Sequence, residues 1–127
     1  IWTRTFQQHL ITKYTNSLGI ELIKVEPCYS SFVGNVQHTF GDAAAAACEI
    51  GRRGLFKYIK GGKFYPIIST EDVSTLAEMF NDVKGFGDVL RSTSVTWVKI
   101  YKFLQKSLGD KDFQHRFRTA NVLKPKR

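Results

Sequence analysis

Cysteine, methionine and proline are scarce in this sequence, and the shortage of cysteine excludes whole classes of protein. Only Cys28 and Cys48 occur in 127 residues, and neither belongs to a Cys-x-x-Cys pair. A disulfide-rich scaffold is therefore excluded, and we expect two buried, small apolar side chains in a protein of a reducing, cytoplasmic compartment. The 3 histidines stand apart without metal-ligand spacing, which argues against a zinc site.

Long apolar runs and acidic residues are scarce as well. No stretch is apolar over the roughly 20 residues that a transmembrane helix needs, and no signal-peptide pattern is present, so we expect no membrane partner. The chain has 19 Lys and Arg but only 11 Asp and Glu, which gives a formal net charge of +8. This excess favours polyanions, with nucleic acid ahead of an acidic membrane surface. A basic protein-interaction domain remains the alternative.

What the chain does contain is enough apolar material for a packed core, with 43% hydrophobic and 13% aromatic residues. The first residue is Ile1 and a helical pattern follows at once, so we expect a piece of a longer polypeptide. Apolar residues recur every four positions over residues 2–18, which predicts a helix that ends at Gly19. Residues 20–26 are rich in β-formers and predict a strand. A helix followed by a strand predicts one step of an α/β sheet.

Further along, the expected elements alternate with turns. Residues 27–41 are rich in turn-forming residues and predict a loop with a short extended piece at 32–33, and residues 64–68 predict a second short extended run. Ser69 and the acids after it predict the start of a helix that continues to residue 80. A further helix is expected over residues 93–108, before a basic tail that frays in its last four residues.

One alanine-rich helix organises these elements. Alanines occupy residues 43–47, which favours helix formation and lets another backbone approach closely. Asp42 opens this helix, where it can serve as the N-cap or as a metal ligand. Glu26 ends the expected strand and can reach the same place, or be a solvated strand end. Glu49 is placed to pair with Arg53 one turn later.

The far end of this helix is basic and carries Phe56 and Tyr58 among its charges. Such a surface suits phosphate contacts with occasional base stacking, and a solvated helix face is the alternative. The nucleic-acid-binding candidates are Arg52, Arg53, Lys57, Lys60 and Lys63.

Motifs over residues 2–54 resemble the last part of a RuvC-like nuclease domain. The sequence V-E-P-C-Y-S-S at residues 25–31 is similar to the V-D-P-x-Y-T-S loop of TnpB-type transposon-encoded nucleases and the related type V CRISPR effectors. The sequence E-I-G-R-R-G at residues 49–54 is similar to the N-I-A-R-K-G that ends the Ala-rich helix of that family. Asp42 matches the third acidic residue of the family, which opens this helix.

This resemblance implies a partial RNase H-like α/β fold with an added helical segment at the C-terminus. Residues 1–60 would be the last part of the nuclease domain, and residues 61–127 a basic, mainly helical appendage. Asp42 would bind Mg²⁺ or Mn²⁺ in a two-ion site, with Glu26 as a second catalytic carboxylate and further acids before Ile1. The implied activity is hydrolysis of DNA or RNA in a mobile element or phage, with a guide RNA among the potential partners.

The chain departs from the family pattern in ways that keep a second hypothesis open. Residues 32–41 replace the zinc ribbon of the family, and an ungapped alignment on Ile50 puts Ala43 at the acidic position. The alternative is therefore a nuclease-dead relative that binds DNA or RNA as a repressor or accessory subunit.

Overall fold

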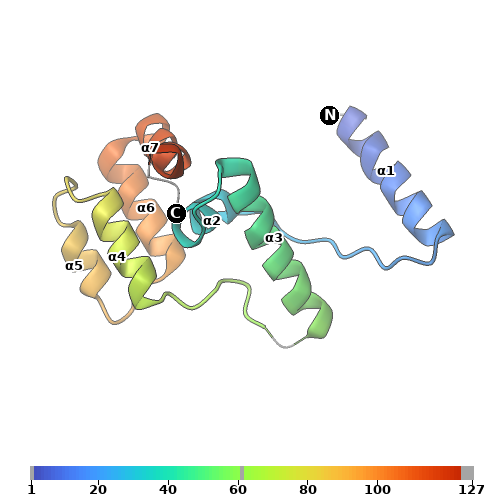
Figure 1. The fold of residues 1–127 in the computed structure, drawn as a ribbon, viewed down its shortest axis with the longest axis horizontal. Helices are drawn as coiled ribbons and strands as arrows, with labels where there is room; N and C mark the ends of the chain where they lie inside the picture. The colour runs from blue at the N-terminus through green and yellow to red at the C-terminus, as the bar shows by residue number, and fades with distance from the viewer. Residues whose placement is uncertain (1, 61, 124–127) are drawn as a thin grey trace.

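The computed structural model describes residues 2–60 and 62–123, with side chains over 5–60 and 62–120, and helices are the one kind of regular secondary structure in this part of the chain (Figure 1). The helices are α1 (Trp2–Ser17), α2 (Ser30–Gln37), α3 (Asp42–Ile59), α4 (Thr70–Met79), α5 (Phe86–Arg91), α6 (Trp97–Leu108) and α7 (Asp110–Leu123). No strand occurs in the described part, so the predicted α/β, RNase H-like fold is wrong here.

The predicted extended segments fail for two different reasons. Residues 20–26 and 64–68 lie outside any helix, but no neighbouring strand in the described chain pairs with them, so β-propensity alone leaves them irregular. Residues 32–33 lie inside α2 instead of forming a short extended piece. Helical spacing puts Phe32, Val33 and Val36 on one buried face, and tertiary packing thus decides the conformation.

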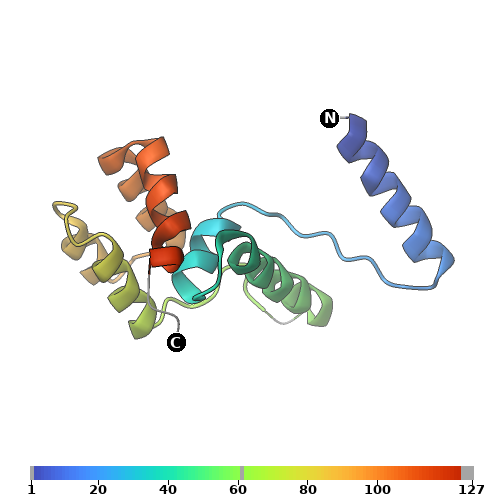
Figure 2. The same ribbon diagram turned by 45° about the horizontal axis from the view of Figure 1, so that its top comes forward.

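The core is built around the aromatic ring of Phe32. Its centroid lies 5.5 to 6.0 Å from the ring centroids of Trp97, Tyr101, Phe113 and Phe117, mostly in edge-to-face or tilted arrangements. Residues of α4 and α5 complete the same cluster. Helix α2 therefore sits against the bundle of α4–α7, and core residues come from both sides of the boundary predicted at residue 60 (Figures 1 and 2).

Helices α2 and α3 approach so closely that one contact admits only glycine. A Cβ atom on Gly34 would lie 2.2 Å from the carbonyl oxygen of Ala45, which is itself fully buried. This confirms the expectation that the alanine run lets another backbone come near. The contact fixes the start of α3 against the middle of α2.

Helix α1 stands apart from the rest of the described chain (Figures 1 and 2). It ends as predicted, because Gly19 adopts a positive φ of 68° after Ser17. The apolar side chains of Phe6, Tyr14 and Leu18 in the predicted stripe are exposed, so these residues do not take part in the core.

The remaining helices follow their local signals. Ser69 and Asp72 form the predicted capping box, with each side chain accepting the other residue's backbone N–H. Helix α6 begins at Trp97, four residues later than predicted, because Thr96 caps it. Residues 81–87, for which the sequence predicts a turn, contain the start of α5 at Phe86. Fraying was predicted for residues 124–127, which lie outside the described residues. Across 2–60 and 62–123, no helix combines the length and the apolar character needed to cross a bilayer.

The close α2–α3 contact predicts opposite effects for two helix-interior glycines. Gly34→Ala should lower the free energy of unfolding by about 1–3 kcal/mol, because the new methyl group overlaps the backbone of α3. Gly51→Ala in α3 meets nothing within 4 Å and should raise stability by about 0.5–1 kcal/mol. Urea denaturation followed by circular dichroism measures both, and equal changes for the two variants would contradict the contact.

Candidate nucleic-acid interface

Asp42 is the first residue of α3, and its carboxylate is held by a neighbouring helix. Gly41, not Asp42, is the N-cap, so the predicted capping role is wrong by one position. The Nδ2 group of Asn35 donates to Asp42 Oδ1 at 2.8 Å and to the carbonyl oxygen of Ser31 at 2.7 Å. Asn35 is fully buried, whereas the Asp42 side chain is 39% exposed. The close packing of α2 on α3 thus turns the carboxylate toward an amide instead of its own helix end.

The second oxygen of Asp42 lies beside a cation from α7. The Nε atom of Arg118 is 3.9 Å from Asp42 Oδ2, and the Arg118 side chain is 47% exposed. The two carboxylate oxygens therefore differ: one accepts from a buried amide, and the other faces a partly solvated guanidinium. Sequence reasoning missed both Asn35 and Arg118, because neither stands at a spacing that points to Asp42.

At Asp42 the described residues offer one carboxylate and no complete metal centre. No group of three His, Cys, Asp or Glu side chains gathers anywhere in the described chain. Glu26, the other predicted catalytic carboxylate, is exposed, and its contact with α3 is made by its backbone carbonyl. The residues present fit a single carboxylate contribution to a divalent-ion site.

The predicted basic cluster contains a buried ion network. Arg53 Nε donates to Glu49 Oε2 at 2.6 Å, which confirms the expected pairing one helical turn apart. Arg52, the residue before Arg53, donates from its Nε atom to Glu49 Oε1 at 2.7 Å. The side chains of Glu49 and Arg53 are each only 1% exposed. Two guanidinium groups on one carboxylate leave a local positive charge inside the fold.

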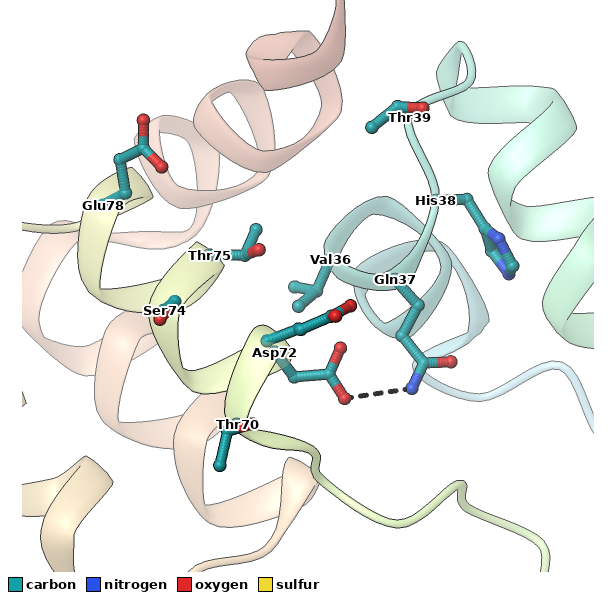
Figure 3. Close-up of a pocket in the computed structure, with 10 residues that line it drawn as sticks. Val36, Gln37, His38, Thr39, Thr70, Asp72, Ser74, Thr75 and Glu78 are labelled. Atoms are coloured by element: carbon teal, nitrogen blue, oxygen red, sulfur yellow. Dashed lines mark hydrogen bonds between the residues drawn. The ribbon is translucent and has the colours of Figure 1, made fainter. Parts of the chain in front are cut away.

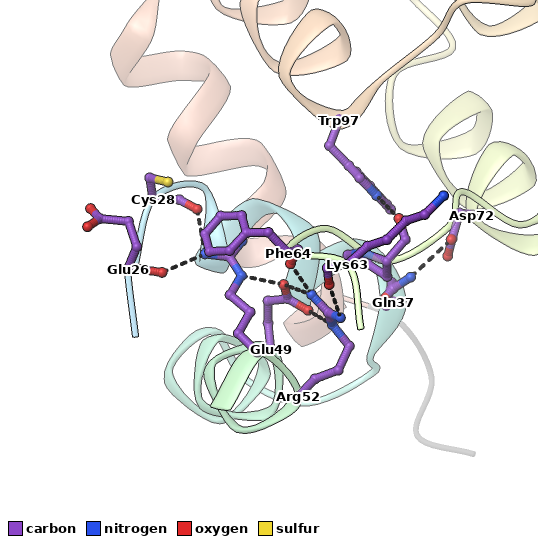
Figure 4. Close-up of polar contacts among 11 residues, drawn as sticks. Glu26, Cys28, Gln37, Glu49, Arg52, Lys63, Phe64, Asp72 and Trp97 are labelled. Atoms are coloured by element: carbon purple, nitrogen blue, oxygen red, sulfur yellow. Dashed lines mark hydrogen bonds and ion pairs between the residues drawn. The ribbon is translucent and has the colours of Figure 1, made fainter. Parts of the chain in front are cut away.

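These arginines hold other segments against α3 (Figure 4). Arg53 Nη1 donates to the carbonyl oxygens of Glu26 at 2.9 Å and Cys28 at 2.7 Å. The guanidinium of Arg52 donates to the carbonyl oxygens of Lys63, at 3.2 Å, and of Phe64. Arg53 therefore lies inside the protein and is not a solvated side chain on the helix surface.

The lysines of the cluster remain on the surface. Lys57, Lys60 and Lys63 are all exposed, and the Nζ atom of Lys57 donates to the carbonyl oxygen of Lys24 at 2.6 Å. Lys60 ends α3 in a left-handed conformation with φ 55°. Of the five predicted nucleic-acid-binding residues, the three lysines are therefore exposed to solvent, whereas the two arginines have a structural role.

No protein family, curated protein or solved structure matches this chain. The likeness to RuvC-like nucleases therefore rests on the motifs alone. Within the motif at residues 49–54, Glu49, Arg52 and Arg53 all belong to the buried network, which gives those residues a structural role here.

A different, acidic pocket lies between the end of α2 and α4 (Figure 3). It has a volume of about 510 Å³ and is bordered by Glu71, Asp72 and Glu78. Gln37 Nε2 donates to Asp72 Oδ2 at 3.1 Å across it. Its negative border does not suit a phosphate group.

The environment of the two cysteines differs from the prediction, and one of them contacts a tyrosine. Cys28 and Cys48 are exposed, so the expectation that they are buried is wrong. The pKa of Tyr65 is raised to about 12, mainly by burial of its side chain and next by a contact with the Cys28 thiol. Tyr65 therefore remains a neutral phenol at physiological pH. On the far side of the bundle, the hydrogen bonds between Asp82 and Arg116 lower the pKa of Asp82.

The buried network predicts a large stability difference between two acidic residues. Glu49→Ala should lower the free energy of unfolding by about 3–5 kcal/mol, because it leaves buried guanidinium charge without its carboxylate. Asp88→Ala removes an exposed pair with Arg91 and should cost under about 1 kcal/mol. Chemical denaturation tests both. A small effect at Glu49 would show that the network contributes little.

Proposed function

We propose that this chain binds the backbone of nucleic acid and contributes Asp42 to a metal-dependent nuclease site whose other ligands come from outside residues 1–127. The observation that carries the proposal is the Asp42 carboxylate, fixed by buried Asn35 and flanked by partly exposed Arg118 at 3.9 Å. A positioned carboxylate offers a ligand for Mg²⁺ or Mn²⁺, and a guanidinium beside it offers donors for phosphate.

Each residue has a separate task in this proposal. Asn35 fixes the carboxylate through Oδ1 and leaves Oδ2 directed to the open side. Arg118 supplies positive charge there, where a phosphodiester group would approach. A bound divalent ion would supply an activated water and stabilise negative charge on the phosphate. The motif order shared with RuvC-like nucleases and the net charge of +8 support the same assignment.

The second candidate is a protein that binds DNA or RNA without cutting it. The observation that favours it is the lack of any three-residue metal-ligand group in the described chain, together with three exposed lysines near the end of α3. Both candidates need nucleic-acid binding, so cleavage separates them.

The nuclease proposal predicts that Asp42→Asn separates cutting from binding. In the longest natural polypeptide that contains these residues, Mg²⁺-dependent cleavage should fall by more than the roughly 10–100-fold that loss of an outer-shell group costs. The dissociation constant for the same substrate should stay unchanged. Asp88→Asn, at an exposed site on α5, is the control. Cleavage of labelled substrate on gels measures the rate.

Two results would count against this assignment. Full cleavage by the Asp42→Asn protein would remove Asp42 from the site. A wild-type protein that binds tightly but cuts no substrate with Mg²⁺ or Mn²⁺ would favour the second candidate.

The binding interface predicts a salt and charge dependence that involves α3. The logarithm of the association constant should fall linearly with the logarithm of salt concentration, since phosphate contacts release counterions. Lys60→Glu should weaken binding more than Lys106→Glu, an exposed change on α6 that alters the net charge equally. Fluorescence anisotropy with labelled oligonucleotides measures both. Equal losses of affinity for the two variants would show that the interface does not involve the end of α3.

A further inference from the structure

A pocket of about 350 Å³ opens beside the second half of α3. Its walls include the apolar side chains of Val25, Phe56 and Phe64, and its edges carry Lys57 and Lys63. We call it the Phe64 pocket. This volume is near the lower end of the range for small-ligand sites, so it suits one compact group and not a large ligand.

Arg53 also lines the Phe64 pocket, and one of its donors has no acceptor. Its Nε and Nη1 groups are satisfied by Glu49 and by two backbone carbonyls. Its Nη2 group is buried and makes no hydrogen bond, while the guanidinium carbon lies 4.2 Å from the centre of the Phe64 ring. Buried unpaired donors are rare in folded proteins, so this group points to an acceptor atom on a ligand.

The charges around the pocket favour an anionic ligand. Glu49 is shared by Arg52 and Arg53, so this network keeps a positive charge. Lys57 and Lys63 add two more positive charges at the edge, against the single carboxylate of Glu26. An apolar wall combined with cationic edges suits a ligand that is flat and apolar at one end and negatively charged at the other.

We propose that the Phe64 pocket holds one unpaired nucleotide of single-stranded nucleic acid. The base lies against the apolar walls, the phosphate contacts Lys57 and Lys63, and Arg53 Nη2 donates to an oxygen of the nucleotide. A base within a duplex is stacked on both faces and paired along its Watson–Crick edge, so it cannot enter such a pocket, which is why the strand is single. The inference rests on the proposed nucleic-acid binding and names its substrate class.

The test compares single-stranded and duplex oligonucleotides of the same sequence on the 127-residue chain by fluorescence anisotropy. Single strands should bind more tightly than duplex. Phe64→Ala should weaken single-strand binding about tenfold and leave duplex binding unchanged, since stacking on an aromatic ring is lost. Lys63→Ala should weaken it more than Lys106→Ala, which removes the same charge on α6. Circular dichroism checks that each variant is folded.

A crosslinking measurement keeps the proposal testable if Phe64→Ala unfolds. A single strand that carries 5-iodouracil should crosslink, on irradiation, to the peptides containing Phe56 or Phe64 in the wild-type chain. Crosslinks confined to other peptides would overturn the proposal. Competition by inorganic phosphate as effective as competition by a mononucleotide would also overturn it.

The outcomes distinguish this inference from the proposed function. If Phe64→Ala and Lys63→Ala weaken single-strand binding no more than the Lys106→Ala control does, the pocket inference is overturned and the proposed function is kept. Equal affinity for duplex and single strand would do the same. A wild-type chain that binds no nucleic acid at low salt would remove the proposed function, and the pocket inference with it.

Discussion

The buried pair between Glu49 and Arg53 is the interaction on which the arrangement around α3 depends. It lets a guanidinium enter the protein, where its Nη1 group reaches the backbone carbonyls of Glu26 and Cys28 just before α2. Arg52, sharing the same carboxylate, reaches residues 63–64 on the other side. Segments distant in sequence are thereby tied to one helix. A buried ion pair is favourable only when its other polar atoms are also bonded, and the backbone carbonyls largely supply those bonds.

The same network explains why the basic cluster divides by residue type. Arginine presents a planar fork of donors that can bind several fixed oxygens at once, whereas lysine carries a compact and strongly hydrated charge. In this chain the arginines at 52 and 53 turn inward to carbonyls, and the lysines at 57, 60 and 63 stay in solvent. The positive charge exposed to solvent near the end of α3 is therefore mainly that of lysine, while the arginines hold the surrounding backbone in place.

How much of this was predictable depends on how local each signal is. The alanine-rich helix α3, the capping box at Ser69 and the pairing of Glu49 with Arg53 follow from neighbouring residues, and all were predicted. The strand predicted at residues 20–26 does not form, because a strand needs a pairing partner that local propensity cannot supply. Asn35 and Arg118 reach Asp42 only through the packing of α2 and α7 on α3, which no spacing in the sequence encodes.

The two proposed sites lie toward opposite ends of one rigid helix, and this sets a geometric relation between them. Asp42 begins α3 and Lys57 lies in its last turn, about 20 Å further along the axis at the helical rise of 1.5 Å per residue. Asp42 is oriented by the contact of Gly34 with Ala45, and the pocket by the network at Glu49. One strand engaged at both sites must therefore run along α3 for several nucleotides. The small, exposed side chains of Ala43, Ala44 and Ala47 at the start of α3 leave that path sterically open.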